Sequence, residues 1–218
     1  MTIERIRDFP GRLLGEADLA QEQLYLREKA RRHNRMLHGW GVVSGLRVRE
    51  GPGTEEITVE PGYALDPNGD EIVVADDVIV ALCREDDDGN AVSPCPRPDR
   101  PQHLRRKRSP DEQLYVAIRY AECATAPVPA GESVEYSRTR ESFAVKLLTK
   151  LPASYRRRRR RPETETHPCP DAVAEPWVVL AEVVLDADSR VSSIDCDRHE
   201  RRVATRPGRV QREVRFPS

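Results

Sequence analysis

The sequence lacks most of the features that would assign a function at once. It has no run of about 18 apolar residues, so no membrane-spanning helix is predicted. Its first residues lack the apolar core of a secretion signal, so we expect a cytoplasmic protein. Neither G-x-x-x-x-G-K-[ST] nor G-x-G-x-x-G occurs, which excludes the common phosphate-binding loops. With a net charge of −1, general attraction to nucleic acid is not expected.

Aromatic residues and cysteines are also scarce. Only three Phe and two Trp occur among 218 residues, so aliphatic side chains must build the core. Five cysteines are widely spaced and form no C-x-x-C pair, which predicts free thiols rather than a disulfide framework. The alternative is a metal site, for which His167 and Cys169 have suitable spacing and Cys123 and His199 are further candidate ligands. Such a site would favour a metal-dependent hydrolase. The residues themselves give no positive sign of a cofactor.

A long amphipathic helix is predicted from about Glu16 to Leu37. Acidic residues lie in its first turn and arginines in its last turns, as the helix dipole favours. One stripe at helical spacing is mostly apolar and consists of Leu19, Leu26, Ala30, His33 and Leu37. We expect His33 to be buried and hydrogen-bonded on this stripe. At about 33 Å the helix is long, so we expect it to pack along a sheet or a neighbouring subunit.

The hydrophobic pattern changes from helical to β spacing around Trp40. Gly39 and Gly41 flank this residue, and glycine tolerates the positive φ values that end a helix. Beyond this hinge, strands are predicted at 42–48, 57–60, 63–65, 72–74, 78–82, 114–120, 142–148, 177–185 and 191–194. Residues 66–69 predict a reverse turn, and residues 123–135, which contain proline and glycine, predict a connection between strands.

These elements predict an α+β protein, with an N-terminal amphipathic helix followed by a mostly antiparallel β-sandwich or barrel-like domain with polar inserts. The expected organisation is an arm and helix at 1–40, a β-rich domain at 41–200 and an extended basic tail at 201–218. Irregular inserts are expected at 84–113 and 155–171. The second insert carries an unbroken arginine run, Arg156, Arg157, Arg158, Arg159, Arg160 and Arg161. We interpret the run first as a solvated insert. The alternatives are contact with nucleic acid phosphates, for which no aromatic interleaving or groove-reading motif is present, and an electrostatic latch for acidic patches of other subunits.

Several blocks in one order resemble a known family. They are the residues 9–19 (FPGRLLGEADL), 22–25 (EQLY), 33–46 (HNRMLHGWGVVSGL) and 59–72 (VEPGYALDPNGDEI), with looser likeness at 120–123, 127–129 and 177–181. This succession is similar to proteins encoded with contractile injection systems, the phage-tail-like particles of bacteria. The resemblance covers about residues 8–82 well and 114–195 more loosely. The two inserts and the tail lie outside it.

The resemblance implies a non-enzymatic structural subunit at the baseplate or cap end of such a particle, assembled in the cytoplasm. It implies other subunits as partners (sheath, tube, baseplate or cap proteins), several symmetric copies, and neither nucleic acid binding nor membrane insertion. As residues of the docking and core surface we predict Leu13, Leu14, Leu19, Leu26, Leu37 and Trp40. A receptor- or fibre-facing binding module of the same particle remains the second hypothesis, and the hydrolase the third.

Overall fold

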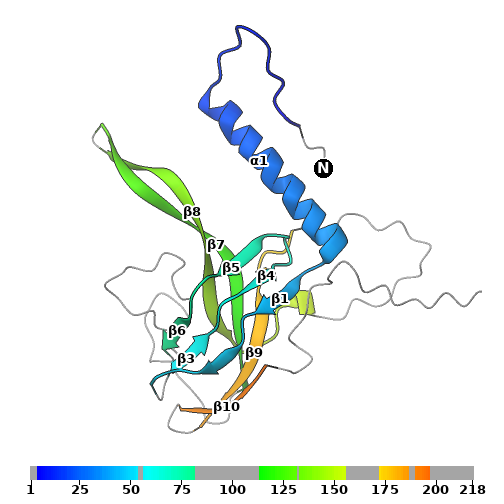
Figure 1. Ribbon diagram of the computed structural model, residues 1–218, viewed down its shortest axis with the longest axis vertical. Coiled ribbons are helices and arrows are strands. Elements are labelled where there is room, and N and C mark those ends of the chain that lie inside the picture. Colours follow the sequence, from blue (N-terminus) through cyan, green and yellow to red (C-terminus); the bar gives the residue numbers. More distant parts are fainter. Residues whose placement is uncertain are drawn as a thin grey trace, which may run out of the picture.

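A computed structural model of the chain describes residues 4–53, 56–81, 113–131, 133–155, 172–186 and 190–196. It confirms an α+β fold in which one N-terminal helix precedes antiparallel sheets that include a curled half-barrel (Figure 1). The helical elements are α1 (Glu16–His33), the π-helical turn η1 (Asn34–His38) and the short 3-10 helix η2 (Ala153–Tyr155). The strands are β1 (Gly41–Gly45), β2 (Val48–Glu50), β3 (Glu56–Val59), β4 (Gly62–Leu65), β5 (Glu71–Val74), β6 (Val78–Ala81), β7 (Gln113–Ala130), β8 (Ser133–Leu148), β9 (Val178–Leu185) and β10 (Val191–Asp195).

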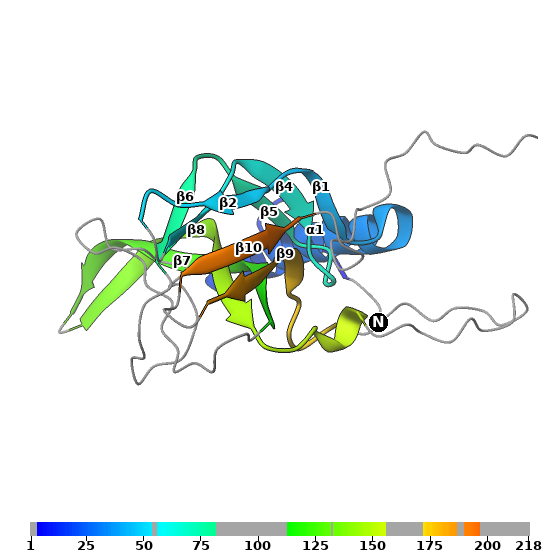
Figure 2. The same cartoon turned by 90° about the horizontal axis from the view of Figure 1, so that it is seen from below.

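The strands form three antiparallel sheets around a shared aliphatic core. The sheet orders are β1-β4-β5, β2-β3-β6 and β10-β9-β7-β8. Strands β1, β2 and β5 contact the four-stranded sheet, so the two small sheets lie over one of its faces (Figure 2). The main core draws on all three sheets, with Ile57, Ile72, Ile118 and Leu180 among its fully buried members. Aliphatic side chains therefore build this core, as the shortage of aromatic residues predicts.

Strand β9 is the most deeply buried element. From Trp177, just before β9, to Leu180 the side chains alternate between a smaller cluster with Trp177 and Val179 on one face of the sheet and the main core with Leu180 on the other. The buried apolar residues further along β9 all belong to the main core. A strand that is covered on both faces needs apolar residues at successive positions rather than alternating ones. This explains the nearly continuous apolar run at 177–185.

Residues 123–135 form part of a β-hairpin, so the prediction of a connection outside the strands is wrong there. Strands β7 and β8 pair continuously from Tyr115↔Leu148 to Ala130↔Ser133, and the distal half projects beyond the body (Figure 1). Proline usually interrupts a strand because it cannot donate to a neighbouring strand. In a two-stranded ribbon, however, each strand has one edge that faces no other strand. Pro127 and Pro129 are compatible with such edges because the missing N–H leaves no ladder partner unsatisfied there.

The helix and the glycine hinge agree with the sequence prediction. Of the two neighbours expected for the helix, the structure contradicts the sheet, and the neighbouring subunit stays a prediction. Helix α1 and η1 together run from Glu16 to His38, and Gly39 has φ +71°. No residue of α1 is buried, so the helix does not pack along a sheet. His33 is exposed, which corrects the expectation of a buried histidine; its ring lies 5.3 Å from that of His38. The periodicity of the sequence identifies which residues share the apolar stripe, but it does not identify which part of the protein, if any, covers that stripe.

Candidate protein–protein interface

The C-terminal end of the helix is fastened to the turn between β4 and β5. Three helix side chains donate to this turn: Arg31 Nε to Asp70 Oδ1 (2.6 Å), Asn34 Nδ2 to the Gly69 carbonyl (2.9 Å) and Arg35 Nη1 to the Asn68 carbonyl (2.8 Å). Positions 31, 34 and 35 share one face because helical neighbours are three and four residues apart. The turn therefore holds the orientation of the helix relative to the β-domain.

The turn is itself preorganised to receive the helix. Asp66 Oδ1 accepts the backbone N–H groups of Asn68 (2.8 Å) and Asp70 (2.9 Å). Gly69 has φ +88°, and a Cβ at this position would lie 2.3 Å from the Arg31 carbonyl oxygen. Only glycine allows both the left-handed conformation and this close approach of the helix backbone. The sequence predicted the turn but not its use as a seat for α1.

The joint places two ionisable groups in a partly desolvated setting. Burial raises the pKa of Asp66 to about 6, although the hydrogen bonds from the Asp70 and Asn68 backbones oppose this change. Burial alone would lower the pKa of Arg31, but its hydrogen bonds to Asp70 and Glu28 outweigh that effect and raise it. Arg31 therefore stays charged and joins the helix to the turn.

Most of the predicted docking residues lie on the surface. Leu13 is 92% exposed, Leu26 is 57% exposed, and Leu14, Leu19 and Leu37 are also exposed. Trp40 is half-buried against the core, and its ring meets that of Tyr155 edge-on at 5.0 Å. Of the six predicted residues, Trp40 therefore packs against the core, and the five leucines lie on the surface. Their role in docking remains a prediction.

The exposure pattern of α1 is inverted relative to that of a helix packed on its own domain. Its half-buried positions are polar or amphipathic: Asp18, Glu22, Tyr25, Glu28 and Arg31. Its leucines face outward, and Leu24 is exposed in addition to those predicted. Phe9 in the arm and Met36 in η1 extend the apolar surface. The stripe at 19, 26 and 37 was visible in the sequence, whereas Phe9, Leu24 and Met36 lie off it and were missed.

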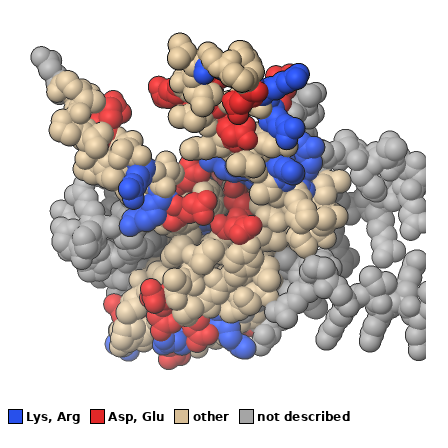
Figure 3. All heavy atoms as spheres, turned by 45° about the horizontal axis from the view of Figure 1, so that its top comes forward, with Lys and Arg blue, Asp and Glu red and all other residues tan. Residues whose placement is uncertain are grey.

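A cleft of about 740 Å³ separates α1 from the base of the β7–β8 hairpin. Its helix wall includes Leu24 and Arg27, its hairpin wall Tyr120 and Glu141, and the β4–β5 turn forms its floor. Acidic side chains gather in this region of the surface (Figure 3). Arg27 Nη1 lies 2.6 Å from Glu122 Oε1 and joins the two walls. The cleft could not be predicted from local sequence patterns, because Arg27 and Glu122 on its two walls are 95 residues apart in the chain.

The cysteines differ from the sequence prediction. Cys123 is buried and disulfide-bonded, so the expectation of free thiols is wrong for this residue. Cys196 is free and buried, with its Sγ 3.3 Å from the Val48 carbonyl oxygen. A disulfide-bonded sulfur is not available as a thiolate ligand, which removes Cys123 from the metal site considered above. Spacing along the chain missed the disulfide because it does not report proximity in space.

Several other sequence predictions lie outside the described residues. They concern His167, Cys169, His199, the arginine run 156–161 and the tail 201–218. Within the described ranges, no group of three or more His, Cys, Asp or Glu side chains is arranged to hold a metal ion. The helices in those ranges include none with the length and apolar character needed to cross a membrane.

Comparison with solved structures finds a likeness in fold, and comparison with known sequences finds none. No family model and no curated protein sequence matches this chain. The crystal structure of TssK, a type VI secretion baseplate protein, is similar with a TM-score of 0.43 and 13% sequence identity. The match covers 89% of this chain and 41% of TssK, so this chain spans about two fifths of the length of TssK. A likeness at this TM-score assigns neither a family nor a function.

Proposed function

We propose that this protein is a non-enzymatic structural subunit of a contractile, phage-tail-like particle, placed at the baseplate or cap end. It docks onto neighbouring subunits through the leucines of its N-terminal arm and of α1. The observation that carries the proposal is the exposure pattern of α1: Leu19, Leu24 and Leu26 are exposed, while four charged residues and one tyrosine take the half-buried positions. Exposed apolar patches of this kind mark protein–protein contacts.

The joint at the end of α1 supports this role. An assembly subunit needs a docking element whose direction is fixed before the partner arrives, because preorganisation lowers the entropic cost of binding. Arg31, Asn34 and Arg35 provide three hydrogen bonds to one turn. Asn68 ties the same turn to residue Val173 by a reciprocal pair of hydrogen bonds (2.6 and 3.1 Å). The helix is thus held by the fold and not by its leucines, which remain available for a partner.

The resemblance of residues 8–82 to injection-system proteins selects the kind of particle. Assembly in the cytoplasm is part of the proposal, since such particles form there. The disulfide at Cys123 is an argument against assembly in a strongly reducing compartment, because disulfides rarely persist there. Chemical determination of the thiol state of Cys123 in freshly lysed cells, under alkylating conditions, tests this part separately. An alkylated thiol would agree with cytoplasmic assembly.

The proposal is tested by locating the chain in particles. A C-terminally tagged chain is expressed in cells that carry the particle genes, and sheathed particles are purified and imaged by cryo-electron microscopy. We expect tag density at one fixed end. Intact particles without the tag, together with a tagged chain that is soluble alone, would overturn the proposal.

A pair of variants assigns the contact to the leucines. Leu19→Gln with Leu26→Gln removes two exposed leucines from α1, and we expect the chain to be lost from particles while its unfolding transition is unchanged. Val73→Gln with Ile79→Gln is the matched control, because these exposed aliphatic residues lie on β5 and β6. Equal loss for both pairs would show that apolar exposure in general, and not α1, determines incorporation.

A receptor- or fibre-facing binding module is the second candidate. The tip of the β7–β8 hairpin favours it, because Val134 and Tyr136 are exposed there opposite Pro129 and Pro127. If the hairpin faces an outside partner, Val134→Ser with Tyr136→Ser should abolish attachment to target cells and leave particle assembly intact. Loss of assembly instead would place the hairpin inside the particle.

A further inference from the structure

The cleft between α1 and the β7–β8 hairpin carries an excess of negative charge. Four carboxylates line it: Asp70, Glu71, Glu122 and Glu141. The two basic residues of the lining already have partners, since Arg27 pairs with Glu122 and Arg31 pairs with Asp70 and Glu28. Among the described residues, neither Glu71 nor Glu141 forms an ion pair. The cleft therefore presents two acidic side chains that lack a basic partner within the described part of the chain.

The acidic residues are held together at a cost to the fold. Glu122 and Glu141 lie directly opposite each other in the β7–β8 ladder, where like charges are destabilising. Burial is the main reason that the pKa of the Tyr120 hydroxyl is raised, and its hydrogen bond to Glu122 and the charges of the nearby carboxylates raise it further. Such an arrangement becomes favourable when a cation enters between the carboxylates.

The shape of the cleft fits a peptide segment. Its volume lies within the about 300–1,000 Å³ of typical ligand sites, and Leu24 and Leu26 from the helix supply apolar area beside the carboxylates. A segment with several arginines matches both properties, since the guanidinium group forms planar contacts with carboxylates and the side-chain stem packs on apolar surface.

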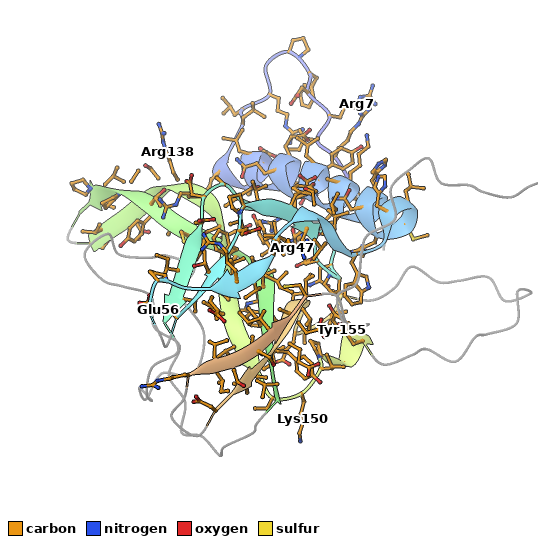
Figure 4. All side chains as sticks on the ribbon, turned by 60° about the horizontal axis from the view of Figure 1, so that its bottom comes forward. Arg7, Arg47, Glu56, Arg138, Lys150 and Tyr155 are labelled. Atoms are coloured by element: carbon orange, nitrogen blue, oxygen red, sulfur yellow. The ribbon has the colours of Figure 1, made fainter. Side chains whose placement is uncertain are left out.

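The same chain carries such a segment. Six consecutive arginines, 156–161, follow directly after η2. Tyr155, the last residue of η2, is fixed to the body, since its hydroxyl accepts the Val179 N–H (2.7 Å) and its ring packs against Trp40. Figure 4 shows Tyr155 and Arg138 of the hairpin on opposite sides of the molecule. Tyr155, the residue that precedes the run in the sequence, therefore lies on a different side of the protein from the hairpin.

We propose that the acidic cleft receives the arginine run 156–161 of a second copy of this chain. The contact joins two different surfaces, the cleft of one copy and the run of the next, so it is heterologous and generates a ring when the rotation closes. The inference rests on the proposed function, because it supplies the contact between copies of the subunit. The arginines and the carboxylates of this contact belong to different copies of the chain. The contact should therefore weaken as salt screens their attraction.

The test uses the purified full-length chain and measures self-association by sedimentation velocity at several salt concentrations. The cleft variant combines Glu71→Gln with Glu141→Gln, and the run variant replaces Arg156–Arg161 by glutamine. We expect each to weaken self-association at least about tenfold, as loss of close charge pairs does at other interfaces. Matched controls change the same number of charges elsewhere: Glu50→Gln with Glu135→Gln for the cleft, and glutamine at the six basic positions 105–108, 201 and 202 for the run. Both controls should associate as the unchanged chain does.

A mixture of the two defective variants decides the geometry. The cleft variant keeps an intact run and the run variant keeps an intact cleft, so an equimolar mixture should form heterodimers although neither variant associates alone. This rescue also shows that both variants are folded. A monomeric unchanged chain at low salt, association that ignores salt, equal losses in the controls, or a mixture without heterodimers would each overturn the inference. These outcomes are distinct from failure of the proposed function, which is read from the position of the chain in particles.

Discussion

Strand β9 and helix α1 are both rich in aliphatic residues, but they place these residues in opposite environments. Seven of the eight residues of β9 are buried, whereas α1 has no buried residue. Strand β9 takes its stability from apolar burial on both faces of a sheet. Helix α1 takes its position from polar contacts, namely those of its C-terminal end with the β4–β5 turn and the Arg27–Glu122 ion pair with the hairpin. The molecule thus separates the surface that holds it together from the surface that it offers to partners.

This separation has a physical consequence for mutations. A buried aliphatic residue contributes to the free energy of unfolding through transfer from water and through packing. An exposed aliphatic residue contributes little to folding and can contribute to binding instead. Variants in the two regions should therefore affect different measurements, and the following predictions test how complete the separation is.

The largest difference is expected between equivalent truncations of two leucines. Leu180→Ala in β9 removes a fully buried side chain and should lower the free energy of unfolding by about 2–5 kcal/mol. Leu26→Ala in α1 should change it by less than about 0.5 kcal/mol, because this side chain is 57% exposed. Urea unfolding followed by circular dichroism measures both values. Similar losses would mean that α1 is part of the folding core after all.

The joint between the two regions can be broken at a single glycine. Gly69→Ala combines a φ of +88° with the clash against the Arg31 carbonyl, and should cost about 3 kcal/mol or detach the helix. Gly131→Ala is the control, since its φ is +65° but a Cβ there meets nothing within 4 Å, and should cost about 1 kcal/mol. Faster hydrogen exchange of α1 only in Gly69→Ala would show that the turn holds the helix. Equal exchange in both variants would refute that role.

The pH dependence of stability should contain a contribution from Asp66. Its pKa is about 6 in the folded protein and 3.8 ordinarily, so between these values the folded state binds the proton more tightly than the unfolded state. Stability therefore falls as pH rises from about 4 to about 6, by at most about 3 kcal/mol from this group. In Asp66→Asn, which keeps the Oδ1 acceptor, this part of the slope should be absent. Urea unfolding at several pH values between about 4 and about 6 measures the free energy of unfolding of both proteins. The same dependence on pH in both would contradict the role given to Asp66.

The smallest effect is expected at the contact that fixes the start of the arginine run. Tyr155→Phe removes the hydroxyl that accepts the Val179 N–H but keeps the ring against Trp40. It should cost about 1 kcal/mol, the usual net value of one hydrogen bond. Thermal unfolding provides the measurement, and Tyr136→Phe on the exposed hairpin is the matched control. A control as destabilised as Tyr155→Phe would mean that the Val179 contact contributes nothing specific.

The sequence predicted the positions of most elements because local patterns determine them. The stripe and charges at 16–37 placed the helix, and the strands at 57–60, 72–74 and 177–185 were recognisable from their apolar residues. The hairpin at 123–135 was missed because prolines usually interrupt strands, and an exposed two-stranded ribbon is the case in which they do not. The buried state expected of His33 was wrong because periodicity identifies a face without identifying its neighbour.

By itself, the sequence determined the helix, its hinge at Gly39, the β4–β5 turn and the aliphatic composition of the core, because each depends on residues close together in the chain. Only the tertiary structure decided which surface the leucines of α1 face, that Asp66–Asp70 serves as the seat of the helix, and that Asp70, Glu122 and Glu141 share one cleft. These features join segments separated by tens of residues or more. Their energies come from contacts and from the exclusion of water, which chain order does not specify.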